Sequence, residues 1–215
     1  MMKDYKIGIK LLKYGYGIKQ NVVCTMLFIV AGFLFIFFIP ENFVGMFYLS
    51  ASALCIVQIL YSLNATAMVN SASRRKALCT SIPVLLCLPL QLIFYGVGSL
   101  AELLMLYMGK VQEQYLAWDM IILGGAMLVF EIFIAGAYKF FMVSVVMACV
   151  GLFAFVFGGD ISLRIVSPDI PLGAAIVIGL AEILLGACLQ YLLSLLLYRH
   201  PISKAAQMWQ LQKYM

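Results

Sequence analysis

Charged side chains are scarce in this sequence. Aspartate, glutamate, lysine and arginine make up 11% of its residues, whereas 65% are hydrophobic. Soluble domains are about half apolar and carry about a quarter of their residues as charges. The shortage of charge therefore excludes an ordinary water-soluble domain and indicates a chain whose surroundings are lipid.

The usual sequence signatures of catalysis are also missing. The only Gly-Lys pair, Gly109-Lys110, lacks the first glycine and the final hydroxyl residue of a phosphate-binding loop. No H-E-x-x-H zinc motif and no G-x-S-x-G nucleophile motif occurs, and the single histidine, His200, follows the last apolar run. We therefore expect no catalytic residue, no metal site and no cofactor in this chain.

Cysteine pairs of the C-x-x-C type are absent. The six cysteines are Cys24, Cys55, Cys79, Cys87, Cys149 and Cys188. Five fall inside apolar runs and Cys79 lies in a connection expected on the cytosolic side, so no disulfide is predicted. We interpret them as small apolar packing residues.

Long apolar runs are abundant. Runs of about 18 residues or more are long enough to span a bilayer as helices. Every backbone polar group in hydrocarbon must be bonded within the chain, and no alternating strand pattern occurs, so each run is expected to be a helix. The predicted fold is a single all-α integral membrane domain over 1–215, whose six transmembrane helices cover about 20–39, 43–63, 82–108, 118–138, 140–157 and 172–197.

Positive charge is unevenly distributed among the connections. If the N-terminus is cytosolic, every lysine and arginine except Lys110 and Arg164 falls on the inner side, as the positive-inside rule requires. We therefore expect a multi-pass protein of the plasma or inner membrane, with both termini and the 198–215 tail in the cytosol. The net charge of +5 then faces anionic lipid and not nucleic acid. Five acids are expected at or beyond the outer edge: Glu41, Glu113, Asp119, Asp160 and Asp169.

The first apolar run follows 19 residues that contain five lysines. The run is too long for the core of a signal peptide and no small-x-small cleavage site follows, so it is expected to stay in the protein. Over residues 3–18 the lysines recur at spacings of three, four and three, which places them on one helical stripe with aromatic and aliphatic residues around it. This pattern predicts an amphipathic helix lying in the inner membrane interface.

Polar residues recur inside the predicted spans. Gln91, Tyr95, Ser99 and Glu102 are spaced four, four and three, which places them on one face of the third span. The sixth span carries Glu182 and Gln190 among small residues, with Ala175, Gly179, Gly186 and Ser194 on the same face, and Glu131 lies in the fourth span.

An ionisable residue at the centre of a bilayer costs on the order of 3 kcal/mol, so these side chains should face protein or water. The spans contain no cation that could pair with the three glutamates, which are therefore either protonated or paired with polar groups. Two interpretations stay open. Gln91, Tyr95, Ser99, Glu102, Glu182 and Gln190 line a substrate pathway, or the polar and small residues simply hold the helices together.

A basic segment joins the second and third spans. Residues 64–81 carry Arg74, Arg75 and Lys76 together, followed by helix-favouring residues up to Cys79. Ser71 or Ser73 would cap a short helix here. The segment is either a positive-inside anchor or a short amphipathic helix presented to a cytosolic partner.

The order of these elements resembles the ABC-2-type permease subunit of bacterial ABC exporters. The run "SASRRKALCTSIP" is similar to the coupling segment of compact permeases in Gram-positive exporters of amphipathic and antimicrobial peptides, such as the phenol-soluble modulin exporter.

The resemblance implies a transport subunit that is not itself an enzyme. Two copies of a separate ATP-binding cassette subunit would supply ATP and Mg²⁺, and a second permease chain, expected to be identical, would complete the pathway. The contact with the ATP-binding subunit would be made by Ser73, Arg74, Arg75, Lys76 and Leu78. Three alternatives remain: an ion-coupled transporter or channel that uses Glu102, Glu131 and Glu182, a membrane scaffold or sensor accessory, and an intramembrane enzyme, for which no nucleophile and base can be assembled.

Overall fold

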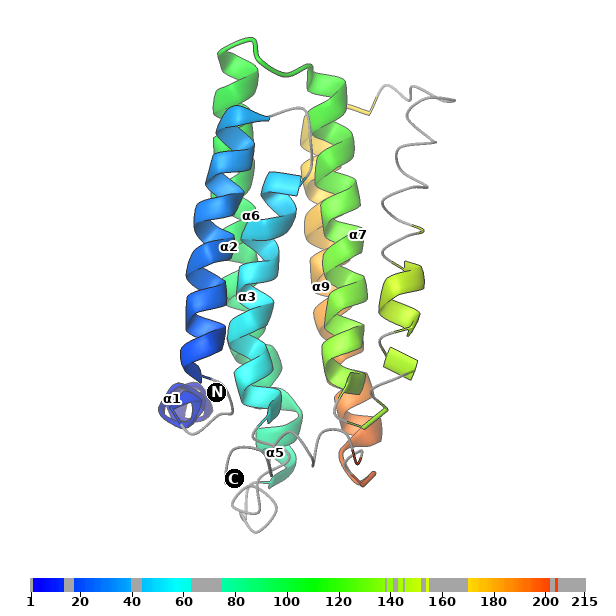
Figure 1. The fold of residues 1–215 in the computed structure, drawn as a ribbon. Helices are drawn as coiled ribbons and strands as arrows, with labels where there is room; N and C mark the ends of the chain where they lie inside the picture. Colours follow the sequence, from blue (N-terminus) through cyan, green and yellow to red (C-terminus); the bar gives the residue numbers. More distant parts are fainter. Residues whose placement is uncertain are drawn as a thin grey trace.

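The computed structural model is a bundle of long helices (Figure 1). It describes residues 2–13, 18–39, 44–62, 75–137, 139–140, 143–144, 146–151, 154, 170–201 and 204. Over these residues the secondary structure is helical and no strand occurs, which confirms the all-α prediction. The helices are α1 (Met2–Leu12), α2 (Ile18–Phe38), α3 (Val44–Ser62), α5 (Arg75–Cys79), α6 (Ser81–Tyr107), α7 (Glu113–Ala137) and α9 (Leu172–Leu197).

Four helical segments of the described chain are long and apolar enough to cross a membrane. They are α2, the continuous stretch of α5 and α6, α7 and α9. The predicted span at 43–63 corresponds to α3, whose apolar part is shorter. Of the predicted span at 140–157, the structure describes helical residues at 143–144, 146–151 and 154, and the rest lies outside the described residues.

The α6–α7 connection is shorter than the sequence indicates. Gly109 takes a positive φ of 69°, and the amides of Gly109 and Lys110 donate to the carbonyl oxygens of Leu106 (2.9 Å) and Met105 (3.0 Å). These bonds end α6 in a tight turn. The next helix then begins at Glu113, five residues before the predicted start at 118, with an acid in its first turn, where the helix dipole favours it.

Asp119 is consequently misplaced by the sequence prediction. It was expected at or beyond the outer edge, but it lies one and a half turns inside α7 and is 7% exposed. The polar residues Glu113 and Gln114, which suggest a loop in the sequence, form the first turn of the helix.

Glycines allow α2 and α3 to pack closely. A Cβ added to Gly45 would lie 2.8 Å from the backbone nitrogen of Ile36, and one added to Gly32 would lie 3.0 Å from the carbonyl oxygen of Gly45. Close backbone approach at small residues is the usual way in which membrane helices associate. The sulfur of Met46 in α3 similarly rests on Gly98 of α6, which joins this helical hairpin to the rest of the bundle.

The most buried span is α7, which packs along α9. Both helices run in the same direction, towards the end of the bundle where α1 lies (Figure 1). We call this end the α1 end. The core around α7 consists largely of Leu116, Met120, Leu123 and Met127 from α7, with Tyr95 and Met105 from α6 and Ala175 and Ile183 from α9.

At the α1 end, α1 lies across the axes of the long helices and is seen end-on in Figure 1. Gly8 of α1 is buried against Ile82 and Leu86 of α6, while Lys6 and Lys10 are exposed. Residues 14–17 of the predicted interfacial helix lie outside the described residues. A second apolar cluster connects α1 to α5, to the start of α6 and to Tyr198 after α9.

The prediction that the cysteines are buried packing residues is right for some of the six. Cys79 and Cys87 are buried, but Cys24, Cys149 and Cys188 are exposed on the outside of the chain. The packing interpretation is wrong for these three, because a small apolar side chain suits a lipid-facing position as well as a helix contact.

Candidate functional site

A line of polar side chains runs through the interior of the bundle between α6, α7 and α9. We call it the polar file. The predicted pathway residues Gln91, Tyr95, Ser99, Glu102 and Gln190 are all buried in it, and Glu182 is half-buried. Asp119, Glu131 and Ser194 are buried as well and belong to the same file, which comprises Gln91, Tyr95, Ser99, Glu102, Asp119, Glu131, Glu182, Gln190 and Ser194.

Glu131 is seated on a glycine of the neighbouring helix. Its Oε2 occupies the space where a Cβ on Gly186 of α9 would lie. The amide of Gln91 in α6 approaches the same carboxyl group. Neither carboxyl oxygen of Glu131 nor either polar atom of the Gln91 side chain makes a hydrogen bond of good geometry within the described residues. Three helices therefore meet at one buried carboxyl group.

Glu182 makes the reciprocal contact. Its Oε2 occupies the Cβ space of Gly124 in α7, so each of the two helices places a carboxyl group on a glycine of the other. The Tyr95 hydroxyl lies over Gly179 of α9 and donates to the Ile176 carbonyl oxygen at 3.3 Å. The absence of side chains at these glycines makes room for the polar groups of the partner helix.

The file continues towards the opposite end of the bundle. Ser99 donates to the carbonyl oxygen of Tyr95 at 2.7 Å, and its Oγ lies 3.3 Å from the sulfur of Met120. Beyond it, Glu102, which is 0% exposed, is close enough to Asp119 for their charges to interact. Both Glu102 oxygens and Oδ2 of Asp119 have no hydrogen-bond partner among the described residues.

The file extends over much of the thickness of a membrane. Gln91 and Glu102 are eleven residues apart in α6, which corresponds to about 17 Å at 1.5 Å per residue. Gln190 and Ser194 extend it towards the α1 end. A hydrocarbon core is about 30 Å thick, so more than half of that depth carries buried polar groups.

The polar file has an excess of acid. Glu102, Asp119, Glu131 and Glu182 belong to it, and the sequences of α6, α7 and α9 contain no lysine, arginine or histidine. Burying an ionised carboxylate without a partner is very costly. These groups are therefore either neutral carboxylic acids or ligands for a cationic group that comes from outside these three helices. Among the described residues no cluster of three or more histidine, cysteine, aspartate or glutamate side chains is arranged to hold a metal ion.

The predicted partner-binding segment is only partly described. Ser73 and Arg74 lie outside the described residues, as do Ser71 and most of 64–81. The helix α5 begins at Arg75, close to the predicted start. Lys76 is exposed and Leu78 is half-buried in the cluster at the α1 end, whereas Arg75 turns inward and lies beside the Cys79 thiol.

Helix α5 is attached to two of the helices that carry the polar file. Thr80 donates to the Lys76 carbonyl oxygen at 2.7 Å and Ser81 to that of Ala77 at 3.3 Å, so two hydroxyl groups bridge the joint between α5 and α6. The Lys76 ammonium lies 5.8 Å from the ring centre of Tyr198, just after α9. Movement of α5 would therefore be transmitted to α6 and α9.

No family model, curated protein or solved structure matches this chain. The polar file and the attachment of α5 are therefore the two features that carry a functional argument. The first supplies a buried, acidic path through the bundle. The second connects that path to a short, basic helix at the α1 end.

Proposed function

We propose that this chain is the membrane-spanning permease subunit of an ATP-driven exporter, in which a separate ATP-binding cassette subunit hydrolyses ATP. The observation that carries the proposal is the position of α5. It is a short basic helix at one end of the bundle, continuous with α6 and in contact with the end of α9. In that arrangement a cytosolic partner that binds and displaces α5 would also move α6 and α9.

In this proposal the α1 end faces the cytosol and α1 lies in the inner interface of the plasma or inner membrane. Exposed Lys76 would contact an acidic surface of the ATP-binding subunit, and Arg74, which lies outside the described residues, is expected from the sequence to take part. ATP-driven closure of two such subunits would displace α5 and tilt α6 against α7 and α9. The polar file, which is closed between these three helices, would then open.

The cargo that fits the file is amphipathic. Buried carboxyl groups would accept the cationic groups of a peptide, while the apolar and methionine-rich surroundings adapt to hydrophobic side chains. The proposal includes two permease chains, identical to each other, and two ATP-binding subunits. Antimicrobial or other amphipathic peptides are the cargo class that we favour.

Charge reversal at α5 tests this function. We expect a P-loop ATPase to co-purify in stoichiometric amount from native membranes in mild detergent, and its recovery to fall at least tenfold with Arg74→Glu/Lys76→Glu. Quantitative mass spectrometry of the eluate measures this. The matched control is Lys110→Glu, because Lys110 is exposed in the turn at the opposite end and should leave recovery unchanged. Recovery of an intact chain with no ATPase, from membranes in which other complexes survive, would refute the proposal.

The acid excess favours one other function, an ion-coupled transporter or channel. The carboxyl groups of Glu102, Asp119, Glu182 and Glu131 follow one another through the bundle and could pass protons or bind a cation. A pH gradient across proteoliposomes that hold only this chain, without nucleotide, should then drive cargo or proton movement. Under the exporter proposal, the same vesicles should be inactive until the ATP-binding subunit and ATP are added.

A further inference from the structure

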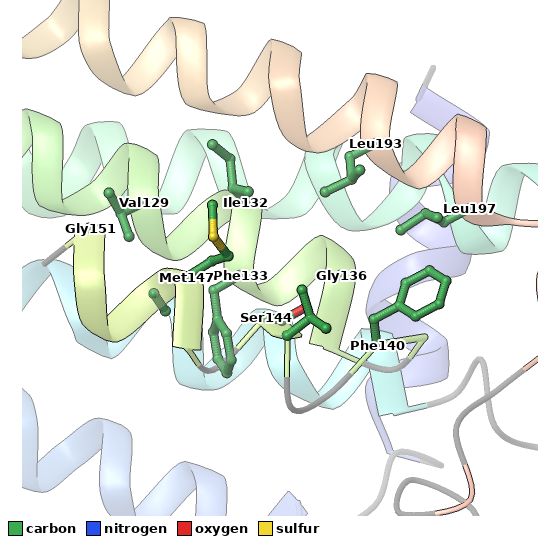
Figure 2. Close-up of a pocket in the computed structure, with 12 residues that line it drawn as sticks. Val129, Ile132, Phe133, Gly136, Phe140, Ser144, Met147, Gly151, Leu193 and Leu197 are labelled. Carbon is green, nitrogen blue, oxygen red and sulfur yellow. The ribbon is translucent and has the colours of Figure 1, made fainter.

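An apolar cavity lies outside the polar file, on the face of α7 towards residues 143–151. It has a volume of about 450 Å³ and is lined by α7, by the described residues of 143–151 and by the last turns of α9 (Figure 2). Among the described residues of the lining, Ser144 is the one with a polar side chain. Cavities of about 300–1,000 Å³ are large enough to enclose much of a small ligand.

The shape of the cavity follows from two glycines. At one end Gly151 packs against Val129, where an added Cβ would lie 2.9 Å from a methyl carbon of valine. Towards the α1 end the Ser144 hydroxyl oxygen packs on Gly136, 2.5 Å from where an added Cβ would lie. From Val129 to Gly136 the wall of α7 is about 10 Å long at 1.5 Å per residue. The cavity is thus an elongated apolar slot that ends near the α1 end.

Cations gather where the slot reaches the α1 end. The ring of Phe140, which lines the slot, packs edge-on at 5.7 Å against the ring of His200. Lys139 donates from its Nζ to the His200 carbonyl oxygen at 2.6 Å, which leaves two of its three N–H groups for other acceptors. The guanidinium of Arg75 is close enough to interact electrostatically with Lys139, and its Nε is buried without a hydrogen-bond partner.

These cations have no matching anion in the described part of the chain. Burial lowers the pKa of Lys139, and the charge of Arg75 lowers it further, while the Cys79 thiol acts in the opposite direction; no carboxylate among the described residues contributes. Two like charges held together at a partly buried position are destabilising unless an anion joins them. Lys139 and Arg75 could therefore bind an anionic group next to the apolar slot.

We propose that the slot and these two cations form a binding site for an anionic membrane lipid. The phosphate-bearing headgroup would accept hydrogen bonds from Lys139 and Arg75, and one acyl chain would occupy the slot between α7, 143–151 and α9. A lipid fits better than a soluble anion, because Phe140 of the slot contacts His200, whose carbonyl oxygen accepts from Lys139, and the slot lies among helices of membrane-spanning length.

The position of the site gives the lipid a structural role. Arg75 belongs to α5 and Lys139 follows α7, so a bridging phosphate would tie the two elements together. The lipid would then restrain the same short helix that we propose as the contact for the ATP-binding subunit. The inference does not depend on that function, because the cavity and the cations are features of this chain alone.

Lipid retention by the purified chain tests the site. Native mass spectrometry after delipidation would compare phosphatidylglycerol with phosphatidylcholine of the same acyl chains, and we expect at least tenfold greater retention of the anionic lipid. The double variant Arg75→Gln/Lys139→Gln should reduce phosphatidylglycerol retention to the phosphatidylcholine level. Lys110→Gln, at the opposite end, should retain as much as the natural sequence.

A second pair of variants tests the slot. Met147→Trp places a larger side chain at an exposed position of the lining, and Gly136→Leu fills the slot more fully; both should lower retention at least fivefold. Thermal melting with added phosphatidylglycerol checks that each variant is folded. Equal retention of the two lipids by the natural sequence, or unchanged retention in the double glutamine variant, would overturn the proposal. If inorganic phosphate raised the melting temperature as much as phosphatidylglycerol does, the acyl chain would play no part in binding. That result would also overturn the proposal.

Discussion

Replacing Gly124 with alanine should destabilise the bundle by about 3 kcal/mol, at the upper end of the usual cost of overpacking. The added Cβ would lie 2.7 Å from the Cα of Gly179 and 2.8 Å from its carbonyl oxygen. These are backbone atoms, so the contact can be relieved only if α7 and α9 move apart. That movement would also disrupt the packing of Glu182 on Gly124 and of Glu131 on Gly186.

Gly96→Ala is the matched control. No atom lies within 4 Å of a Cβ at that position, and alanine is favoured over glycine in a helix by about 0.8–1 kcal/mol. The control should therefore be as stable as the natural chain or slightly more stable. Unfolding in mixed micelles of increasing denaturing detergent measures both variants. Equal stability of Gly124→Ala and Gly96→Ala would contradict the close packing of α7 on α9.

Gly186→Ala should have an intermediate effect. A Cβ there would overlap the carboxyl end of Glu131, which is the far end of a flexible side chain, and would lie 3.0 Å from the Cα of Leu128. The carboxyl group of Glu131 can rotate away, although it would then no longer pack against α9 at position 186. The expected order of stability is Gly96→Ala, then Gly186→Ala, then Gly124→Ala, and the same unfolding series checks it.

Glu182→Gln and Glu131→Gln should leave the protein folded and lower transport at least tenfold. Glutamine has nearly the shape of protonated glutamic acid and can hydrogen-bond, so the packing on Gly124 and Gly186 is retained. It cannot ionise, and it therefore offers no charge to a cationic cargo and no site for a transferred proton. Uptake into inverted proteoliposomes, with the ATP-binding partner present, measures the loss.

The matched control for the glutamines is Glu113→Gln. Glu113 is exposed in the first turn of α7, outside the polar file, and its replacement should leave transport unchanged. Full transport in Glu182→Gln and Glu131→Gln would mean that these groups only hold the helices together. Loss of folding in both variants would point to the same structural role, because the carboxylic acid itself would then be needed for packing.

Local patterns in the sequence account for much of the fold and for one wall of the site. The apolar runs predict the positions of α2, α3, α6, α7 and α9 to within about five residues at each end, because a helix in lipid satisfies its own backbone. The spacing of Gln91, Tyr95, Ser99 and Glu102 predicts a single buried face, since helical periodicity is a property of one segment. The α5 helix also follows from its own residues.

The rest of the site depends on which helices pack against each other. Short-range sequence patterns do not predict that pairing. The seating of Glu131 on Gly186 joins residues 55 positions apart, and that of Glu182 on Gly124 joins residues 58 apart. Asp119 enters the file because the turn at Gly109 starts α7 early. Lys139 and Arg75 likewise come within electrostatic range only through the tertiary fold, in which α5 contacts α6 and the end of α9.

The amino-acid sequence by itself determined that this chain is all-α with apolar helices of membrane-spanning length, where those helices lie to within about five residues, and which polar side chains share a face of one helix. These properties depend on interactions between residues within about one or two helical turns. Tertiary structure alone decided that four carboxyl groups share one interior and that an apolar slot ends near two cations, Arg75 and Lys139, with no carboxylate beside them among the described residues. Such arrangements depend on how closely two backbones approach each other, and that distance is set by packing across the whole bundle.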